Sequence, residues 1–156
     1  MKKFAFALMA AVATLFSLGF TSCSDDDDEP SVSNGEIYGM WETDYLDCWE
    51  KYDGVLDPDS QFKGEFYDWR FYFGKDGTYK FYLKSGSEWE LEESAVWSSL
   101  SGNKIIISYE DGEKSAEISI KTLSSKKLEM EVRQKYYDED DGDVESYGYI
   151  LLHKVN

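Results

Sequence analysis

Apolar and polar residues alternate with a period of two through most of the chain beyond residue 66. Residues 67–73 place an aromatic side chain at every second position, and residues 116–120 and 128–132 repeat the pattern with Ala, Ile, Leu, Met and Val. Successive side chains of a β-strand point to opposite faces of its sheet, so the pattern is typical of strands with one buried face. Short segments rich in Gly, Asp, Asn and Ser separate these runs. The pattern predicts an all-β antiparallel domain of about eight strands.

The order of the predicted strands favours a closed sheet. Strands joined in chain order by short turns form an up-and-down meander, whose two end strands expose unpaired backbone groups unless they pair with each other. The first predicted strand, residues 39–45, starts soon after the acidic segment, and the last runs almost to Asn156. We therefore expect an eight-stranded antiparallel up-and-down barrel over residues 36–156.

The N-terminal region has the layout of a secretory signal peptide. Two lysines precede the apolar stretch 4–20, which carries no charge and ends in small residues before Cys23. This stretch is at the lower length limit for a spanning helix, so an uncleaved membrane anchor is the alternative. We expect residues 1–22 to be removed and residues 23–35 to form an acidic tether, too polar to fold alone.

The charge and the cysteines limit the partners and the redox chemistry. The 32 acidic and 16 basic residues give a net charge of −16, which argues against nucleic acid, whose phosphates require Lys and Arg. This sign hints at cationic partners or divalent ions, although solubility is the simpler explanation. With Cys23 at the end of the signal peptide, Cys48 has no partner for an internal disulfide. We expect Cys48 to be a small buried hydrophobic residue rather than a reactive thiol.

Several short motifs resemble one family of β-barrel proteins. They are Gly39-x-Trp41, Phe73-x-x-Asp76-Gly77-Thr78-Tyr79, Trp97 before Ser101-Gly102-Asn103, Ile118-x-x-x-x-Leu123-Ser124-x-x-x-Leu128, and the ending Leu151-Leu152-His153-Lys154-Val155. Over residues 36–156 the chain resembles the lipocalin-like lipoproteins of Bacteroidetes. Gly-x-Trp also occurs in true lipocalins, where the Trp plugs the closed end of the barrel, so the resemblance implies a structural role for Gly39 and Trp41. It also implies an eight-stranded barrel that can hold a small apolar ligand.

The residues around the predicted cleavage site resemble a bacterial lipobox and an export signal. Cys23 is followed by Ser24 and then by the acidic residues Asp25, Asp26, Asp27 and Asp28 of the candidate export signal. The resemblance implies that Cys23 is multiply acylated, which gives an effectively permanent membrane anchor. It also implies transport to the outer face of the outer membrane.

The longest predicted connection contains the first candidate ligand-binding residues. Residues 46–64 depart from the short turns found elsewhere and include Trp49, Tyr52 and Phe62. A long loop in a compact domain is usually functional or disordered, and aromatic content argues against disorder. In lipocalins the corresponding loop is a lid over the open end. These aromatics would line a ligand entrance or stack on sugar rings, or they would merely cap the barrel mouth.

The remaining candidate residue is Glu93, the one carboxylate on the apolar parity of its strand. If buried, it would need a partner or a proton and would anchor a polar ligand group. A β-bulge that turns Glu93 outward is the alternative. An eight-stranded barrel is just wide enough to be filled by side chains or to hold one small ligand. The many aromatic residues on the apolar parity therefore favour a filled core, or a shallow pocket at one end.

Metal binding and catalysis have little support in the residues. Aligning Gly142 with the sixth position of an EF-hand loop places Tyr137 first, where Asp is required, so the acidic turn 138–143 does not match. His153 is the one histidine in the chain, which excludes a cluster of histidine ligands. No nucleophile elbow or phosphate loop occurs. We expect no enzyme activity, no cofactor and no metal.

These observations lead to one main expectation for function and one rival. The chain is expected to be a surface-anchored outer-membrane lipoprotein that binds a small apolar or amphipathic molecule without catalysis. The rival is a protein- or glycan-interaction module with a solid barrel and functional loops. A third option is an accessory subunit of an outer-membrane uptake complex. The sequence does not identify the ligand, the protein partner or the oligomeric state.

Overall fold

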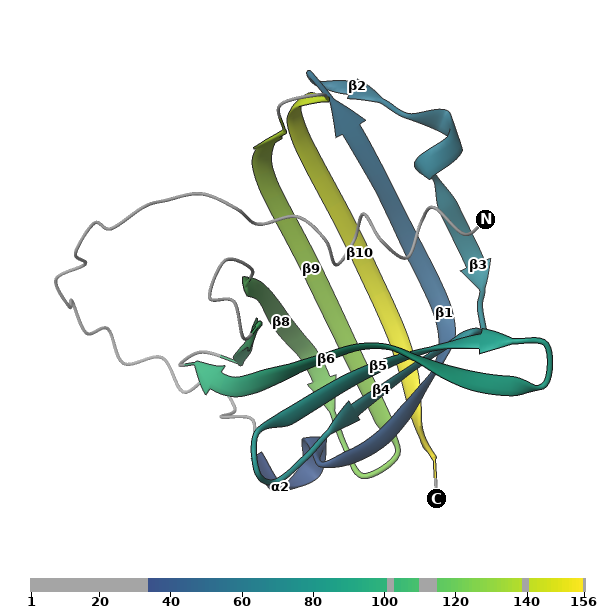
Figure 1. Ribbon diagram of the computed structural model, residues 1–156, viewed down its shortest axis with the longest axis vertical. Coiled ribbons are helices and arrows are strands. Elements are labelled where there is room, and N and C mark those ends of the chain that lie inside the picture. The colour runs from purple at the N-terminus through teal and green to yellow at the C-terminus, as the bar shows by residue number, and fades with distance from the viewer. Residues whose placement is uncertain (1–33, 101–102, 110–114, 139–140, 156) are drawn as a thin grey trace, which may run out of the picture.

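The computed structural model describes residues 34–100, 103–109, 115–138 and 141–155 (Figure 1). The predicted signal peptide, Cys23 and the acidic run 24–28 lie outside this range. Among the described residues, no helix is long and apolar enough to cross a membrane.

The described residues form ten strands and two short helical segments. In chain order these are α2 (Asn34–Ile37), β1 (Gly39–Tyr52), β2 (Val55–Leu56), the 3₁₀ segment η1 (Pro58–Ser60), β3 (Phe62–Glu65), β4 (Trp69–Phe73), β5 (Thr78–Ser85), β6 (Glu88–Leu100), β7 (Lys104–Ser108), β8 (Ser115–Leu123), β9 (Lys127–Asp138) and β10 (Gly142–Val155).

Eight of these strands close into the predicted barrel. β1 and β4 to β10 are neighbours in chain order, each pair antiparallel, and β10 returns to pair with β1 from Met40↔Val155 to Tyr52↔Val144. Closure pairs the first strand with the last and so removes the exposed edges of an open meander. The predicted eight-stranded antiparallel up-and-down barrel is confirmed.

Three strands of the barrel are longer than most of the others and extend past them. β1, β9 and β10, here called the long wall, continue upward in Figure 1 beyond the level at which β4, β5 and β6 cross. Along its length β1 changes its second partner from β4 to β3 and then to β2. We call the end of the barrel near α2 the closed end, and the end with the β1–β2 and β9–β10 turns the open end.

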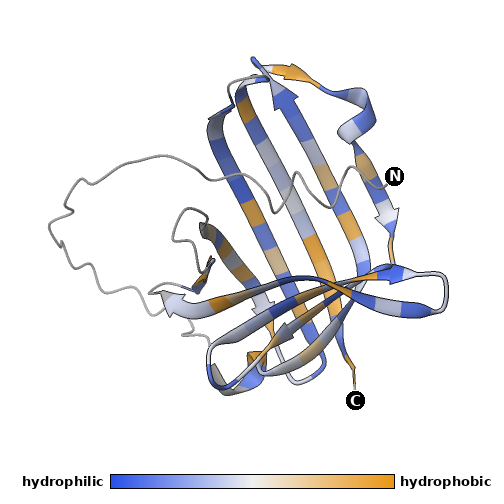
Figure 2. Ribbon diagram, in the orientation of Figure 1, coloured by the Kyte–Doolittle hydropathy of each residue, from blue (hydrophilic) through white to orange (hydrophobic). Residues whose placement is uncertain are grey.

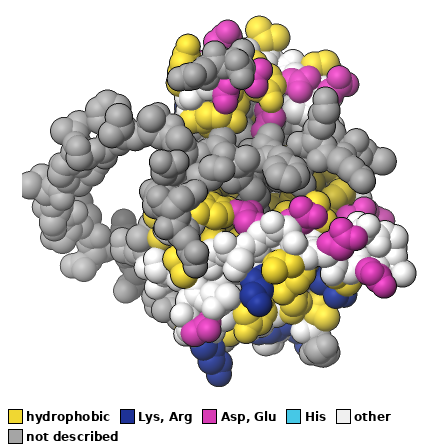
Figure 3. Space-filling view, in the orientation of Figure 1, with side chains coloured by type: hydrophobic (Ala, Val, Ile, Leu, Met, Phe, Trp, Pro, Cys, Tyr) yellow, Lys and Arg dark blue, Asp and Glu magenta, His cyan; other side chains and the backbone are white. Residues whose placement is uncertain are grey.

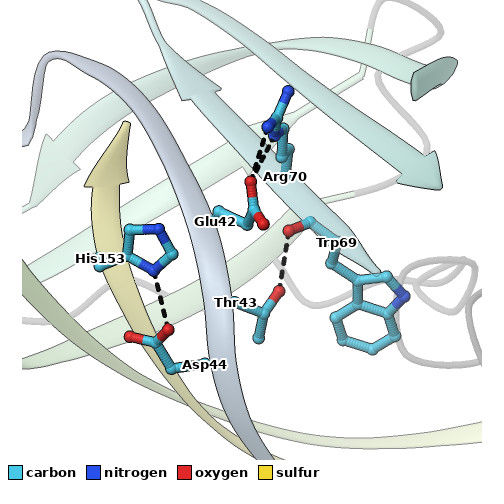
Figure 4. Close-up of polar contacts among 6 residues, drawn as sticks. All are labelled: Glu42, Thr43, Asp44, Trp69, Arg70 and His153. Atoms are coloured by element: carbon cyan, nitrogen blue, oxygen red, sulfur yellow. Dashed lines mark hydrogen bonds and ion pairs between the residues drawn. The ribbon is translucent and has the colours of Figure 1, made fainter. Parts of the chain in front are cut away.

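The partner change along β1 coincides with a β-bulge. Thr43 lies opposite Leu152 and Tyr45 lies opposite Leu151, so Asp44 is the extra residue. The Thr43 hydroxyl donates a hydrogen bond to the backbone carbonyl of Trp69 over 2.9 Å, at the start of β4 (Figure 4). The Asp44 carboxylate lies 2.8 Å from Nδ1 of His153 on β10. The first contact ties β1 to the start of β4, and the second ties β1 to β10.

The predicted lid loop is mostly strand, and this part of the prediction was wrong. Residues 46–52 continue β1, and residues 62–65 form β3 alongside it. The bulge at Asp44 shifts the alternation by one position, so the buried residues after it fall on Leu46 and Cys48. The bulge interrupts the alternation of apolar and polar residues near residue 45. In the sequence, this interruption was interpreted as the end of the strand and the start of a loop.

The core fills the closed end and the middle of the barrel with aromatic and aliphatic side chains. Trp41 is fully buried, and its indole nitrogen donates to the carbonyl of Ile37 in α2 over 2.7 Å. Trp97 donates to the carbonyl of Gly74 over 3.0 Å. Gly39 has φ +119°, and a Cβ there would lie 3.1 Å from Cε of Lys154, which explains Gly before Trp41. Apolar and polar positions alternate along the long strands in Figure 2.

Candidate functional site

The inner face of the long wall changes from apolar to polar toward the open end. The strand registers place one residue each of β1, β10 and β9 side by side in rows across this face. One row, here called the polar row, consists of Glu50, Ser146 and Gln134. The next row toward the barrel centre consists of Cys48, Gly148 and Val132. The next row toward the tip consists of Tyr52, Val144 and Tyr136.

Glu50 is the most unusual residue of the polar row. It is only 6% exposed, although it is a carboxylate. Its Oε2 accepts a hydrogen bond from the Tyr52 hydroxyl over 2.8 Å, while its Oε1 has no partner among the described residues. The backbone of Glu50 bonds to the Ser60 hydroxyl over 2.8 Å, so η1 is tied to this part of β1. A buried carboxylate oxygen without a partner carries a desolvation penalty that a ligand with a donor would relieve.

Burial and nearby acids act on the protonation of Glu50. Burial raises the pKa of its carboxyl above the ordinary value, and the charges of Asp57 and Asp141 raise it further against the lowering effect of the Tyr52 hydrogen bond. Burial also raises the pKa of Tyr136 to about 12, with the charge of Glu50 as the next cause. The open end is therefore a negatively charged and partly desolvated environment.

Gln134 provides a second unmatched group in the same row. It is 9% exposed, and its Oε1 has no hydrogen-bond partner among the described residues. Ser146, which lies between Glu50 and Gln134 in the register, is also buried. Buried polar groups are paired in the great majority of proteins, so two unpaired oxygens in one row require an explanation.

A surface hollow lies next to the polar row. Its volume is about 460 Å³, and it is lined by Gly54, Lys135, Tyr136, Asp143, Val144 and Glu145. Tyr136 and Val144 are the inward residues one row beyond Gln134 and Ser146. Figure 3 shows acidic side chains at the end of the molecule where β2 lies and also across its middle, whereas the Lys and Arg side chains visible in this view lie toward the other end. The hollow gives a molecule from solvent a place next to the row.

Aromatic rings lead from the open end into the core. Phe62 lies opposite Cys48 in the β1–β3 register and packs edge to face on Phe66, with ring centroids 5.3 Å apart. Phe66 packs on Trp69 at 5.0 Å, and Trp69 packs on Phe81 at 5.7 Å. These rings give the inner space an apolar surface below the polar row.

The structure separates the residues predicted for the ligand entrance. Tyr52 and Phe62 face inward at the open end, but Trp49 faces outward. The Trp49 ring stacks on Tyr147 at 5.6 Å, and Arg133 lies 4.8 Å from the Tyr147 centroid. Because Trp49 and Arg133 lie on the strands that flank Tyr147, they cover opposite faces of its ring. This group therefore offers little free ring surface for stacking on a sugar.

A β-bulge lies next to Glu93, but it does not turn Glu93 outward, as the alternative interpretation of the sequence had expected. Phe81 lies opposite Glu93 and Tyr82 opposite Leu91, so Glu92 is the extra residue. Glu93 stays on the inward parity with the buried Ala95 and is half-buried. The bulge instead turns Trp89 and Leu91 outward, where the Trp89 ring lies 4.0 Å from the Arg70 guanidinium. Glu93 also helps burial to raise the pKa of Tyr79, and it lies outside the polar row.

Sequence reasoning missed all three residues of the polar row. Each is a polar residue on the apolar parity of its strand, the same signal that singled out Glu93. Glu50 was assigned to a loop, and the strand parity could not be followed there. Gln134 and Ser146 lie just outside the alternating segments that the sequence predicted, where exposed polar residues are ordinary.

The chemistry of the site is that of binding groups. Among the described residues, no group of His, Cys, Asp and Glu is placed to hold a metal ion. Cys48 is buried below the polar row, and burial raises the pKa of its thiol to about 11. The thiol is therefore protonated near neutral pH and poorly nucleophilic.

The comparisons with known proteins agree with the barrel geometry. A family profile described as "lipocalin-like domain" matches residues 37–130, more than half of the chain. The chain belongs to the lipocalin-like domain family. The predicted family resemblance is therefore confirmed for the folded domain.

Solved structures similar to this lipocalin-like chain include bovine odorant-binding protein. Its complex with undecanal is 22% identical, with a TM-score of 0.45, over 85% of this chain and 78% of that one. A deswapped triple mutant of the same protein is 21% identical, with a TM-score of 0.44, over 77% of this chain and 74% of that one. No curated protein sequence is significantly similar to the chain.

Proposed function

We propose that this lipocalin-like domain binds a small amphipathic molecule at the open end of its barrel, without changing it chemically. The observation that carries the proposal is the polar row. It buries unpaired oxygens of Glu50 and Gln134 beside a hollow of about 460 Å³ and next to an aromatic interior. A site that binds small molecules typically combines an apolar surface with a few convergent polar groups.

The two parts of the site suit the two parts of such a ligand. The rings of Phe62, Phe66 and Trp69 give an apolar body a surface to pack on. The polar row would bind its polar head. The odorant-binding proteins similar in structure are also known in complexes with small molecules, undecanal among them.

We also propose that the domain is anchored in the outer membrane through acylated Cys23 and faces the cell exterior. The support is the sequence, with a signal-peptide layout before Cys23 and an acidic run after it. Replacing Cys23 with Ala should release the protein from the membrane fraction. Replacing residues 25–28 with Ala should keep it in the outer membrane but remove labelling by an impermeant reagent. Unchanged attachment or unchanged labelling, respectively, would contradict this location.

The rival function as a glycan-binding module has less support at the residues first considered for it. Both faces of the Tyr147 ring are covered, and Trp49 stacks against one of them. Sugar recognition by stacking needs an open ring face. We therefore place the binding function inside the barrel rather than on the outer face of the long wall.

Native mass spectrometry tests the proposed binding directly. A chain that starts at Ser24 contains every described strand and the whole buried core, and it can be purified gently from a cell lysate without detergent. We expect an added mass of a small organic molecule that is lost on denaturation. A clean apo mass, together with no binding of an apolar fluorescent probe, would contradict the proposal.

Gly148 offers a variant that blocks the site. It lies on the inward face between Cys48 and Val132, and its φ is not in the left-handed region. Gly148→Val should fill this position next to the polar row and abolish probe binding, with circular dichroism as a check of the fold. The outward-facing substitution Tyr149→Val in the same strand is the control and should leave probe binding unchanged.

A further inference from the structure

We propose that the ligand of the open end carries an ammonium group, which binds to Glu50 and Gln134 in the polar row. This inference rests on the proposed function, and it specifies the chemical class of the ligand. The expected ligand is a primary amine attached to an apolar body.

The unmatched groups of the polar row are hydrogen-bond acceptors. Oε1 of Glu50 and Oε1 of Gln134 both lack partners, and both side chains are at least nine-tenths buried. Neighbouring strands lie about 4.8 Å apart, so these residues start about 10 Å apart across Ser146. Both side chains are long enough to reach the space above Ser146. An ammonium group supplies three donors at one point and can serve both oxygens and the serine hydroxyl.

The charge around the site favours a cation over a neutral or negative head. The described parts of residues 50–60 and 134–145 contain eight acidic and two basic residues. The basic ones, Lys51 and Lys135, are on the outward parity, and both lie within ion-pair distance of Glu145. Lys135 also lines the hollow beside the row, together with Asp143 and Glu145. The Glu50 carboxylate itself has no ion pair among the described residues. Hydrogen bonds to a buried charge are stronger than those between neutral groups.

The size of the neighbouring space suggests a short apolar body. The hollow of about 460 Å³ adjoins the row at Tyr136 and Val144. On the other side of the row, Cys48 and Val132 give an apolar surface that continues to the ring of Phe62. An alkyl chain attached to the ammonium group would lie along these side chains.

Three ligands that share an eight-carbon chain but differ in head group test whether the site prefers an ammonium group, a hydroxyl or a carboxylate. Octylamine, octanol and octanoate can be titrated calorimetrically at pH 7.5 into the chain that starts at Ser24. We expect octylamine to bind about tenfold or more tightly than octanol, since a hydrogen bond to a charged group contributes about 1.5–3 kcal/mol. Octanoate should bind most weakly, because its carboxylate would lie next to Glu50. Equal affinities, or a preference for octanol or octanoate, would overturn the ammonium assignment and leave the proposed pocket standing.

A charge-neutral variant tests the role of Glu50 itself. Glu50→Gln keeps the shape and an acceptor for the Tyr52 hydroxyl. It should weaken octylamine binding about tenfold while octanol binding stays within about twofold. Glu131→Gln is the matched control, since it removes one negative charge from the outer face of β9 and should change neither affinity. An equal loss in both variants would reduce the effect to net charge and overturn the assignment. If neither octylamine nor octanol binds, the proposed pocket falls together with the assignment.

Discussion

The two ends of the barrel interior are built in opposite ways. At the closed end, two buried tryptophans donate hydrogen bonds to backbone carbonyls, Trp41 to Ile37 and Trp97 to Gly74. At the open end, Glu50 and Gln134 are also buried, with 6% and 9% exposure, yet each keeps an oxygen without a partner among the described residues. The three strands of the long wall run through both regions. Strand pairing alone therefore does not account for the difference.

This contrast separates stability from binding along one sheet. Paired polar groups and filled space stabilise the closed end, whereas unpaired buried oxygens at the open end cost free energy in the empty protein. Such a cost is commonly concentrated at functional sites, where a ligand relieves it. The contrast predicts that substitutions at the closed end mainly lower stability and that those at the open end mainly change binding and pH dependence.

The largest effect is expected from removing the closed-end tryptophan. Trp41→Ala should lower the free energy of unfolding by about 3–5 kcal/mol, because a fully buried Trp leaves a large cavity. Trp49→Ala removes the same side chain from the outer face, where it stacks on Tyr147, and should cost about 1 kcal/mol. Urea denaturation followed by far-UV circular dichroism measures both.

The milder substitution Trp41→Phe keeps the comparison measurable if Trp41→Ala fails to fold. Phe fills most of the space but cannot donate to the Ile37 carbonyl. Similar losses for Trp41→Ala and Trp49→Ala would break the comparison, because they would show that the closed end carries no special share of the stability.

An intermediate effect is expected at the bulge between the two ends. Thr43→Val keeps the side-chain volume but removes the donor to the buried Trp69 carbonyl, which should cost about 1–3 kcal/mol. Thr122 is the matched control, since it also lies beside a register shift and also donates a hydrogen bond, but it is exposed. Thr122→Val should change the free energy of unfolding by less than about 0.5 kcal/mol. Equal effects in the two variants would mean that the Thr43 hydrogen bond does not hold β1 to the start of β4.

The predictability of the barrel differs between its regular and irregular parts. Alternation and short turns were enough to predict eight strands and their closure, because these signals are local and repeat along the chain. The bulge at Asp44 was not predicted, and a bulge near Glu93 was considered only as a way to turn Glu93 outward. Each bulge inverts the facing of the residues beyond it. The polar row depends on the first bulge, since the facing of Glu50 can be read only once Asp44 is known to be the extra residue. Predicting the polar row also requires the register of three strands. The register of β1 against β10 depends on pairing between residues nearly a hundred positions apart.

The smallest effect, and the sharpest test of the open end, is the pH dependence contributed by Glu50. Its pKa is raised in the folded protein above the ordinary 4.5, first by burial. Its contribution to stability is therefore fully present below pH 4.5 and is lost as the pH rises through the raised value, because the folded state then holds a poorly solvated charge. Glu50→Gln removes this loss, so its stability relative to the wild type should increase from pH 4 to pH 8.

The Lys127 ion pair lowers the pKa of Glu129 on the outer face, so Glu129→Gln should become less stable than the wild type over the same range. Free energies of unfolding in urea at both pH values give the two differences, and the shared titration of the other acids cancels in each. Changes of the same sign in both variants would contradict the comparison, because inner and outer carboxylates would then respond alike.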